Sequence, residues 1–202
     1  MEKLKKKNDI SYYLLRILIF FVIIVLGTLA KANEMVIGEE KISPGINLVF
    51  EAAIKDDIEP KEFHLEEKDS DIHIEALVTW SSDGPRGSME GGFIPYLNIE
   101  VQIINQRTQE KAVYKLTPHL NMSDNFHYAN NLKLPGKIHD NYDVRFTISP
   151  PKKGDIGFHY DWREGVNKNL ISKKIFIYKD QNFLNIARLK RRETLYFNNL
   201  IR

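Results

Sequence analysis

Residues 96–104 read Tyr-Leu-Asn-Ile-Glu-Val-Gln-Ile-Ile, and this stretch decides the fold class of the 202-residue chain. Apolar and polar residues alternate strictly along it, which is the period of a β-strand with one buried face. The polar residues 105–110 then turn the chain, and residues 112–116 return as the partner of a hairpin. The centre of the chain is therefore predicted to be an antiparallel β-structure.

The rest of the chain between 34 and 180 has the same character. Further strands are predicted over 46–54, 72–80, 127–134, 142–149 and 173–178. Turn-forming segments such as the Gly/Pro/Ser-rich loop 81–92 separate them, and no segment has a clean helical period. The spacing predicts an all-β protein, an immunoglobulin-like β-sandwich of about seven to nine strands. Tyr142 opens a strand after a polar turn, which is the position of a tyrosine corner.

The first 32 residues have the pattern of a secretory signal peptide. A lysine-rich start precedes the apolar run 17–26, and Ala30-Lys31-Ala32 follows. The apolar run is shorter than the ~20 residues that a spanning helix needs. We therefore expect a cleaved signal at 1–32, a mature chain that starts near Asn33, and a location in the periplasm; an uncleaved N-terminal anchor is the alternative.

The absence of cysteine and the distribution of charge exclude several kinds of site and disfavour one class of partner. The chain has no cysteine, which excludes disulfides, zinc–thiolate sites and blue-copper sites. Residues 33–167 carry 14 Lys/Arg and 23 Asp/Glu, so the central domain is acidic. An acidic surface favours cations and disfavours nucleic acid as a partner.

The chain divides into the signal peptide, a domain at 33–180 and a basic tail at 181–202. The tail has scattered aromatic and aliphatic residues among its basic ones. It is interpreted either as an amphipathic helix in weak contact with an anionic membrane surface or a partner, or as a frayed terminus.

The histidines raise the question of a metal site. In Ser70–Ala76, which reads SDIHIEA, the strand period places His73 and Glu75 on one face. His119 and His127 bracket a loop that contains Met122, and His159 follows a Pro/Gly turn. Imidazole with a carboxylate or thioether suits copper, zinc or ferrous iron. No fixed ligand spacing connects these residues, so each histidine by itself is equally interpreted as an ordinary surface or hydrogen-bonded residue.

Catalytic motifs are missing. The chain has no GxSxG sequence and no cysteine nucleophile, and its glycine-rich loop precedes a strand rather than a helix. We therefore do not expect an enzyme.

Four blocks in order resemble the periplasmic iron-transport-associated proteins, which are soluble partners of iron permeases. The blocks are DIHIEA (71–76), GGFIPYLNIEVQI (91–103), LTPHL with FHYANN (116–131) and GFHYDWREGV (157–166). The resemblance covers most of 38–180. It implies an immunoglobulin-like homodimer that binds copper and takes part in iron uptake with an inner-membrane permease.

The resemblance also implies a ligand set. Its glutamate and histidines fall on His73, Glu75, His127 and His159. The family usually has methionine where this chain has His119, so either His119 is the ligand or Met122 reaches the site from the loop. A histidine in place of methionine would harden the site toward Cu(II), Fe(II) or Zn(II).

The leading hypothesis is a periplasmic metal-binding protein with a copper site and iron as its cargo. The alternative is a secreted β-sandwich that binds a protein partner and whose histidines are incidental. A metal-binding test on a histidine variant separates the two.

Overall fold

The computed structural model describes residues 34–190. The predicted signal peptide and the end of the basic tail lie outside these residues. The described part contains eight strands, β1 (Glu34–Ile42), β2 (Ile46–Ala53), β3 (Ile72–Trp80), β4 (Asn98–Asn105), β5 (Lys111–Asn121), β6 (Asn125–Leu132), β7 (Tyr142–Ser149) and β8 (Lys174–Gln181). Short helices are η1 (Lys61–Phe63), η2 (Glu67–Asp69), α2 (Tyr160–Gly165) and α3 (Leu184–Arg188). The all-β prediction is confirmed. Between residues 34 and 190, no helix has the length and apolar character needed to cross a membrane.

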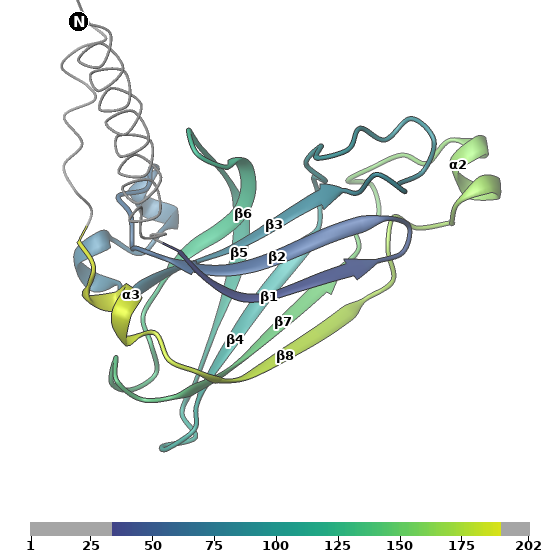
Figure 1. Cartoon of the computed structure of the whole chain (residues 1–202). Coiled ribbons are helices and arrows are strands. Elements are labelled where there is room, and N and C mark those ends of the chain that lie inside the picture. Colours follow the sequence, from purple (N-terminus) through teal and green to yellow (C-terminus); the bar gives the residue numbers. More distant parts are fainter. Residues whose placement is uncertain (1–33, 191–202) are drawn as a thin grey trace, which may run out of the picture. The chain divides into compact units, whose positions relative to one another are not determined.

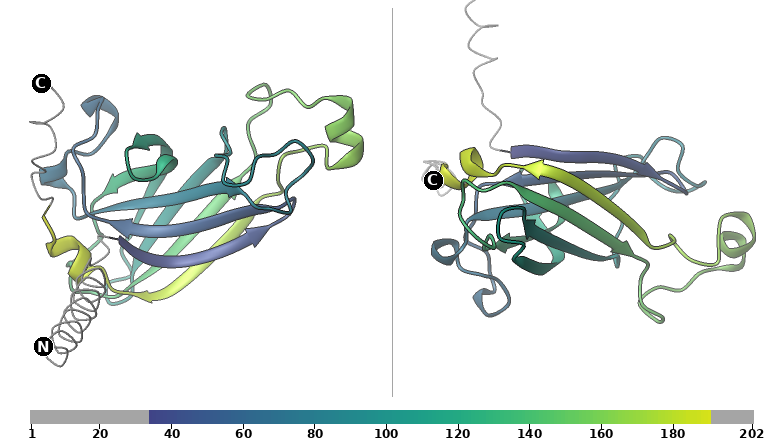
Figure 2. Two further views of the ribbon diagram at one scale, coloured as in Figure 1. Left: turned by 45° about the horizontal axis from the view of Figure 1, so that its top comes forward. Right: turned by 90° about the horizontal axis from the view of Figure 1, so that it is seen from below.

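The strands form one antiparallel sheet in the order β1-β2-β3-β6-β5-β4-β7-β8. Strand β5 connects two layers, because its first half, up to Leu116, pairs with β4 and its second half, from Thr117, pairs with β6. The sheet therefore folds over at β5, as Figures 1 and 2 show.

The two edge strands meet where the layers close. The Tyr178 hydroxyl of β8 donates a hydrogen bond to Glu40 Oε1 of β1 at 3.0 Å. The Tyr178 ring occupies the space that a Cβ would need at Gly38. The absence of a side chain at Gly38 therefore lets the two edges approach.

Alternate residues of the strands fill the core between the layers. Phe50 of β2 stacks on Phe146 of β7 with ring centroids 4.0 Å apart, and neither side chain is exposed. The Tyr142 hydroxyl donates to the Lys137 carbonyl at 2.7 Å, which is the hydrogen bond of a tyrosine corner. This bond favours the immunoglobulin-like arrangement, which stays a prediction.

The sequence-based strand limits agree with the structure for β3 and β7 and differ elsewhere. Strand β1 was not predicted, and its register shifts between Val36 and Gly38, which marks a bulge that interrupts the alternation. Strand β5 continues through Pro118 to Asn121, where the prediction ended it at Leu116. Beyond residue 180, Phe183 and Ile186 are buried in the core.

Two irregular regions lie at opposite ends of the sheet. The segment 54–71 between β2 and β3 lies at the same end as the β5–β6 hairpin, whereas α2 lies at the other end (Figures 1 and 2). This separation decides which of the predicted ligands can meet.

Candidate metal centre

The predicted pair His73 and Glu75 lies on the face of β3 that points away from the core. Ile72, Ile74 and Ala76 fill the core, so the intervening side chains take the opposite face. Strand β6 pairs with β3 and places Asn131 opposite His73. These pairings give the face a row of polar side chains.

The β5–β6 hairpin adds two more imidazoles to this face. His119 and His127 are direct cross-strand partners. One ligand atom from each of His73, His119 and His127 lies within 4.8 Å of the others. Residues that are far apart in the sequence therefore bring three imidazoles to one point.

Glu75 lies between two of these imidazoles. Its Oε1 is 3.5 Å from His73 Nε2 and 3.9 Å from His127 Nε2. All three side chains are buried, and Glu75 is 5 % exposed. Its other oxygen, Oε2, has no hydrogen-bond partner among the described residues. A buried oxygen without a partner is costly in a protein interior, and a metal ion would provide the partner.

Hydrogen bonds orient the two imidazoles that face Glu75. His73 Nδ1 donates to Asn131 Oδ1 at 3.0 Å, and His127 Nδ1 donates to the Asn125 carbonyl at 3.1 Å. Because these partners are acceptors, they assign the proton to Nδ1 and leave the Nε2 lone pairs available. Histidines that bind metals are usually held in this way through their second nitrogen. His119 uses its other ring nitrogen for a hydrogen bond. Its Nε2 lies 3.2 Å from the Thr117 hydroxyl, so Nδ1 is the nitrogen that remains for a metal.

Burial keeps His73, His119 and Glu75 in their neutral forms at pH 7. Burial lowers the pKa of His73 to about 4, and burial together with the neighbouring histidines lowers the pKa of His119 to about 3. Burial raises the pKa of Glu75 to about 8, with a further contribution from nearby carboxylates, Asp124 first among them. At pH 7 the contact between His73 and Glu75 is therefore a neutral one rather than an ion pair. Neutral imidazole is the form that binds a metal.

The cluster lies in a cavity of about 510 Å³. Its lining residues are Ile54, Asp56, Asp57, Ile58, Glu59, Pro60, His64, His73, Glu75, Pro118, His119, Leu120, Asn121 and His127. The segment 54–71 closes one side, and Asn131 holds it there through hydrogen bonds from Nδ2 to the carbonyls of Asp56 at 2.7 Å and Leu65 at 2.8 Å.

Two residues of this region were missed by the sequence analysis. His64 lies in the segment 54–71, which has no strand or helix period that would place it. Asn131 lies on β6, and its role depends on a partner 58 residues away in the sequence. No local signal in the sequence points to either residue.

The structure does not bring His159 to the cluster. His159 precedes α2 and lines a different pocket with Trp80 and Trp162. Trp80 ends β3 and His73 lies near its start, so about 23 Å of strand separates the two positions. The structure therefore does not bring His159 and His73 of one chain together, and His159 as a ligand stays a prediction.

The alternative ligand Met122 also lies away from the cluster. It is 95 % exposed in the turn between β5 and β6 and does not line the cavity. Within one described chain, the predicted ligands that meet are His73, Glu75, His119 and His127. The geometry therefore favours His119 over Met122.

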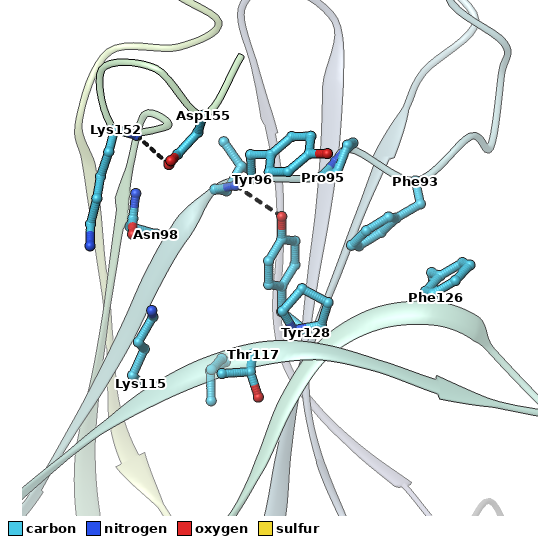
Figure 3. A pocket seen from close by; sticks show the side chains of 13 residues that line it. Phe93, Pro95, Tyr96, Asn98, Lys115, Thr117, Phe126, Tyr128, Lys152 and Asp155 are labelled. Atoms are coloured by element: carbon cyan, nitrogen blue, oxygen red, sulfur yellow. Dashed lines mark hydrogen bonds between the residues drawn. The ribbon is translucent and has the colours of Figure 1, made fainter. Parts of the chain in front are cut away.

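A second cavity of about 510 Å³ lies beside β5 and has a different chemistry (Figure 3). Aromatic side chains such as Phe93, Phe126 and Tyr128 line it, and none of its described lining residues is a histidine. The Tyr128 hydroxyl accepts from the Leu97 amide at 3.0 Å and donates to the Ile94 carbonyl at 2.8 Å. The Tyr128 hydroxyl thus holds the segment that leads into β4, and Asp155 is the one carboxylate among the described residues that line this cavity.

A family model and a relative both match most of this chain. The family described as Fe2+ transport protein matches residues 31–183. A UPF0423 protein of Brucella abortus strain 2308 is 28 % identical over 157 residues, which cover 74 % of this chain and 84 % of the relative.

Two solved structures are similar at comparable identity. Copper-reconstituted P19 of Campylobacter jejuni is 28 % identical with a TM-score of 0.64, over 74 % of this chain and 96 % of P19. FetP of uropathogenic Escherichia coli strain F11, recombinantly expressed in the periplasm of E. coli, is 29 % identical with a TM-score of 0.63, over 74 % of this chain and 96 % of FetP.

Proposed function

The chain belongs to the Fe2+ transport protein family, and from this premise we propose that it is a periplasmic protein whose copper centre supports iron uptake by an inner-membrane permease. The family is one of transport proteins rather than enzymes, in agreement with the sequence analysis. The observation that carries the proposal is the convergence of three imidazoles, two of which lie beside a buried glutamate that lacks a partner for one oxygen among the described residues.

The residues present fit a copper ion. His73 and His127 would bind through Nε2, His119 through Nδ1 and Glu75 through its carboxylate. Three nitrogens and one oxygen are donors that Cu(II) accepts well. Copper would supply one-electron Cu(II)/Cu(I) chemistry beside the iron cargo. Copper in the solved structure of P19 supports this assignment.

The surroundings of Glu75 are acidic, which supports a cation as the cargo. Glu51 of β2 is the cross-strand neighbour of Glu75, and Glu34 of β1 lies nearby. Burial, and then repulsion from neighbouring carboxylates, raises the pKa of both Glu34 and Glu51. Each carboxylate is therefore stabilised by an arriving divalent cation, and iron is the cation that we propose.

We further propose that the protein acts as a homodimer, because this arrangement reconciles His159 with the ligand set. His159 is exposed and directly precedes α2, which lies at the end of the sheet opposite the segment 54–71. In a dimer, the partner's His159 can reach a cluster that the same chain's residue cannot. Sedimentation would measure the assembly, and His159→Ala should weaken copper binding without changing the fold.

The periplasmic location rests on the signal pattern and on the periplasmic expression of FetP. An intact mass of the exported protein should correspond to a chain that starts near Asn33. A mass that retains residues 1–32 would support the anchored alternative.

The experiment that tests the function is a Cu(II) titration of the metal-stripped exported protein beside two variants. His127→Ala removes a cluster ligand, and His139→Ala removes an exposed histidine that does not line the cavity. We expect one tightly bound ion per chain in the parent and in His139→Ala, and greatly weakened binding in His127→Ala. Equally weak binding in all three would instead favour the partner-binding β-sandwich.

Iron as cargo needs a separate measurement. Uptake of radioactive iron by cells that carry the permease should fall when the parent gene is replaced by His127→Ala. Unchanged uptake, together with normal copper binding by the parent, would remove iron transport from the proposal and leave the copper centre.

A further inference from the structure

His64 lies beside the cluster although the sheet does not carry it. It follows η1 in the segment 54–71 and lines the same cavity as His73 and His119. The ring centroids of His64 and His119 are 4.9 Å apart with the rings nearly perpendicular, at 86°. His119 is in turn 5.6 Å from His73 by the same measure. His64 is therefore a fourth imidazole, next to the three that the strands contribute.

The hydrogen-bonding state of His64 indicates that a partner is missing. Its Nδ1 atom is buried and has no hydrogen-bond partner among the described residues. The perpendicular ring contact with His119 places aromatic surface against the ring and supplies no acceptor or donor to Nδ1. Buried polar atoms in proteins nearly always have a partner, and an imidazole nitrogen in a histidine cluster finds one in a metal ion.

Hydrogen bonds attach the segment that carries His64 near its two ends and at Leu65, the residue next to His64. Asn131 binds the carbonyls of Asp56 and Leu65, and Lys55 Nζ donates to the Ser70 carbonyl at 2.8 Å. Neither η1 nor η2 contains a buried residue, and Phe63 is 77 % exposed. A bond through His64 would therefore add a side-chain attachment beside η1, which contains no buried residue.

We infer that His64 is a further imidazole ligand of the proposed centre, and that an ion bound there fastens the segment 54–71 to β5 through His64 and His119. This inference rests on the proposed metal centre and adds a ligand that comes from a loop. With His64, four imidazoles of one chain face the cavity. Such a donor set suits Cu(II), which prefers a tetragonal arrangement of nitrogens, better than a set that contains a thioether.

The test uses the metal-stripped exported protein, with Cu(II) as the probe, in four forms. The parent is compared with His64→Ala, with His64→Gln, which keeps a polar side chain of similar size, and with the matched control His139→Ala. Electron paramagnetic resonance reports the nitrogens bound to Cu(II), and a competition titration reports the affinity. For both His64 variants we expect a changed nitrogen hyperfine pattern and an affinity at least about tenfold weaker. His139→Ala should match the parent.

Hydrogen exchange provides an independent readout of the loop. Cu(II) should slow amide exchange over residues 61–69 in the parent and in His139→Ala, but not in the two His64 variants. Parent-like spectra, affinities and exchange in the His64 variants would overturn this inference and leave the proposed function intact. A parent that binds no copper would overturn both.

Discussion

Asn131 Oδ1 accepts a hydrogen bond from His73 Nδ1 at 3.0 Å, across the paired strands β3 and β6. The same amide oxygen accepts from the Asp56 amide at 3.2 Å, and the amide nitrogen donates to two carbonyls of the segment 54–71. One buried side chain therefore sets the tautomer of a proposed ligand and attaches the loop that covers it. Asn131 therefore connects the proton position on His73 with the placement of the loop that lines the cavity.

Replacement of Asn131 should consequently affect both stability and metal binding. Asn131→Ala leaves two loop carbonyls and His73 Nδ1 without their partner. We expect the free energy of unfolding to fall by about 2–4 kcal/mol in urea denaturation. Copper affinity should fall about 10–100-fold, because His73 loses its orientation. Asn98→Ala is the control, since Asn98 donates one hydrogen bond to the Pro150 carbonyl away from the cluster. Parent-like copper affinity in Asn131→Ala would contradict the orienting role.

Copper affinity should depend on pH through Glu75. The pKa of Glu75 is raised to about 8, so below that pH an ion that binds the carboxylate must displace a proton. The pKa values of His73 and His119, about 4 and about 3, lie too low for these histidines to compete with protons near neutrality. We expect the apparent affinity to rise up to about tenfold per pH unit between about pH 6 and 8 and to level off above. Titrations with Glu75→Gln should lack this rise, and an equal slope in that variant would exclude Glu75 as its source.

The stability of the metal-free protein should also depend on the ionisation of Glu75. The pKa of Glu75 is higher in the folded protein than its ordinary value of 4.5, so the folded state binds the proton more tightly. Stability attributable to this group is therefore fully present below pH 4.5 and is lost as the pH rises toward 8. Glu75→Gln removes this loss. We expect its stability relative to the parent to improve by at least about 1 kcal/mol between pH 5 and 8, measured by urea denaturation in the presence of a chelator. A constant difference across this range would show that Glu75 ionises freely in the folded state.

Closure of the two layers should depend on Gly38. A methyl group there meets the ring of Tyr178, which must shift and disturb the hydrogen bond from its hydroxyl to Glu40. We expect Gly38→Ala to lower the free energy of unfolding by about 1–3 kcal/mol. Gly157→Ala is the matched control, because a Cβ at Gly157 has no atom within 4 Å. Thermal unfolding of both variants checks the prediction, and equal midpoints would mean that the edges close without this contact.

The sequence by itself determined the local structure of most strands. Alternation along Ile72–Trp80 predicted β3 at its observed limits and placed His73 and Glu75 on one face, since the side-chain period of a strand is two residues. Where a bulge broke the period, as at Gly38 in β1, the strand was missed. Periodicity is a short-range property, so it identifies the face of a side chain without identifying its neighbours.

Only the tertiary structure decided which histidines meet. Cross-strand register placed His119 opposite His127, the loop contributed His64, and the length of β3 separated His159 from the cluster. These relations depend on how the whole sheet pairs and closes at β5, and many weak contacts between distant residues together decide that arrangement. A local sequence pattern does not describe contacts between distant residues. The types of ligand could therefore be predicted from the sequence, whereas the place where the ligands come together could not.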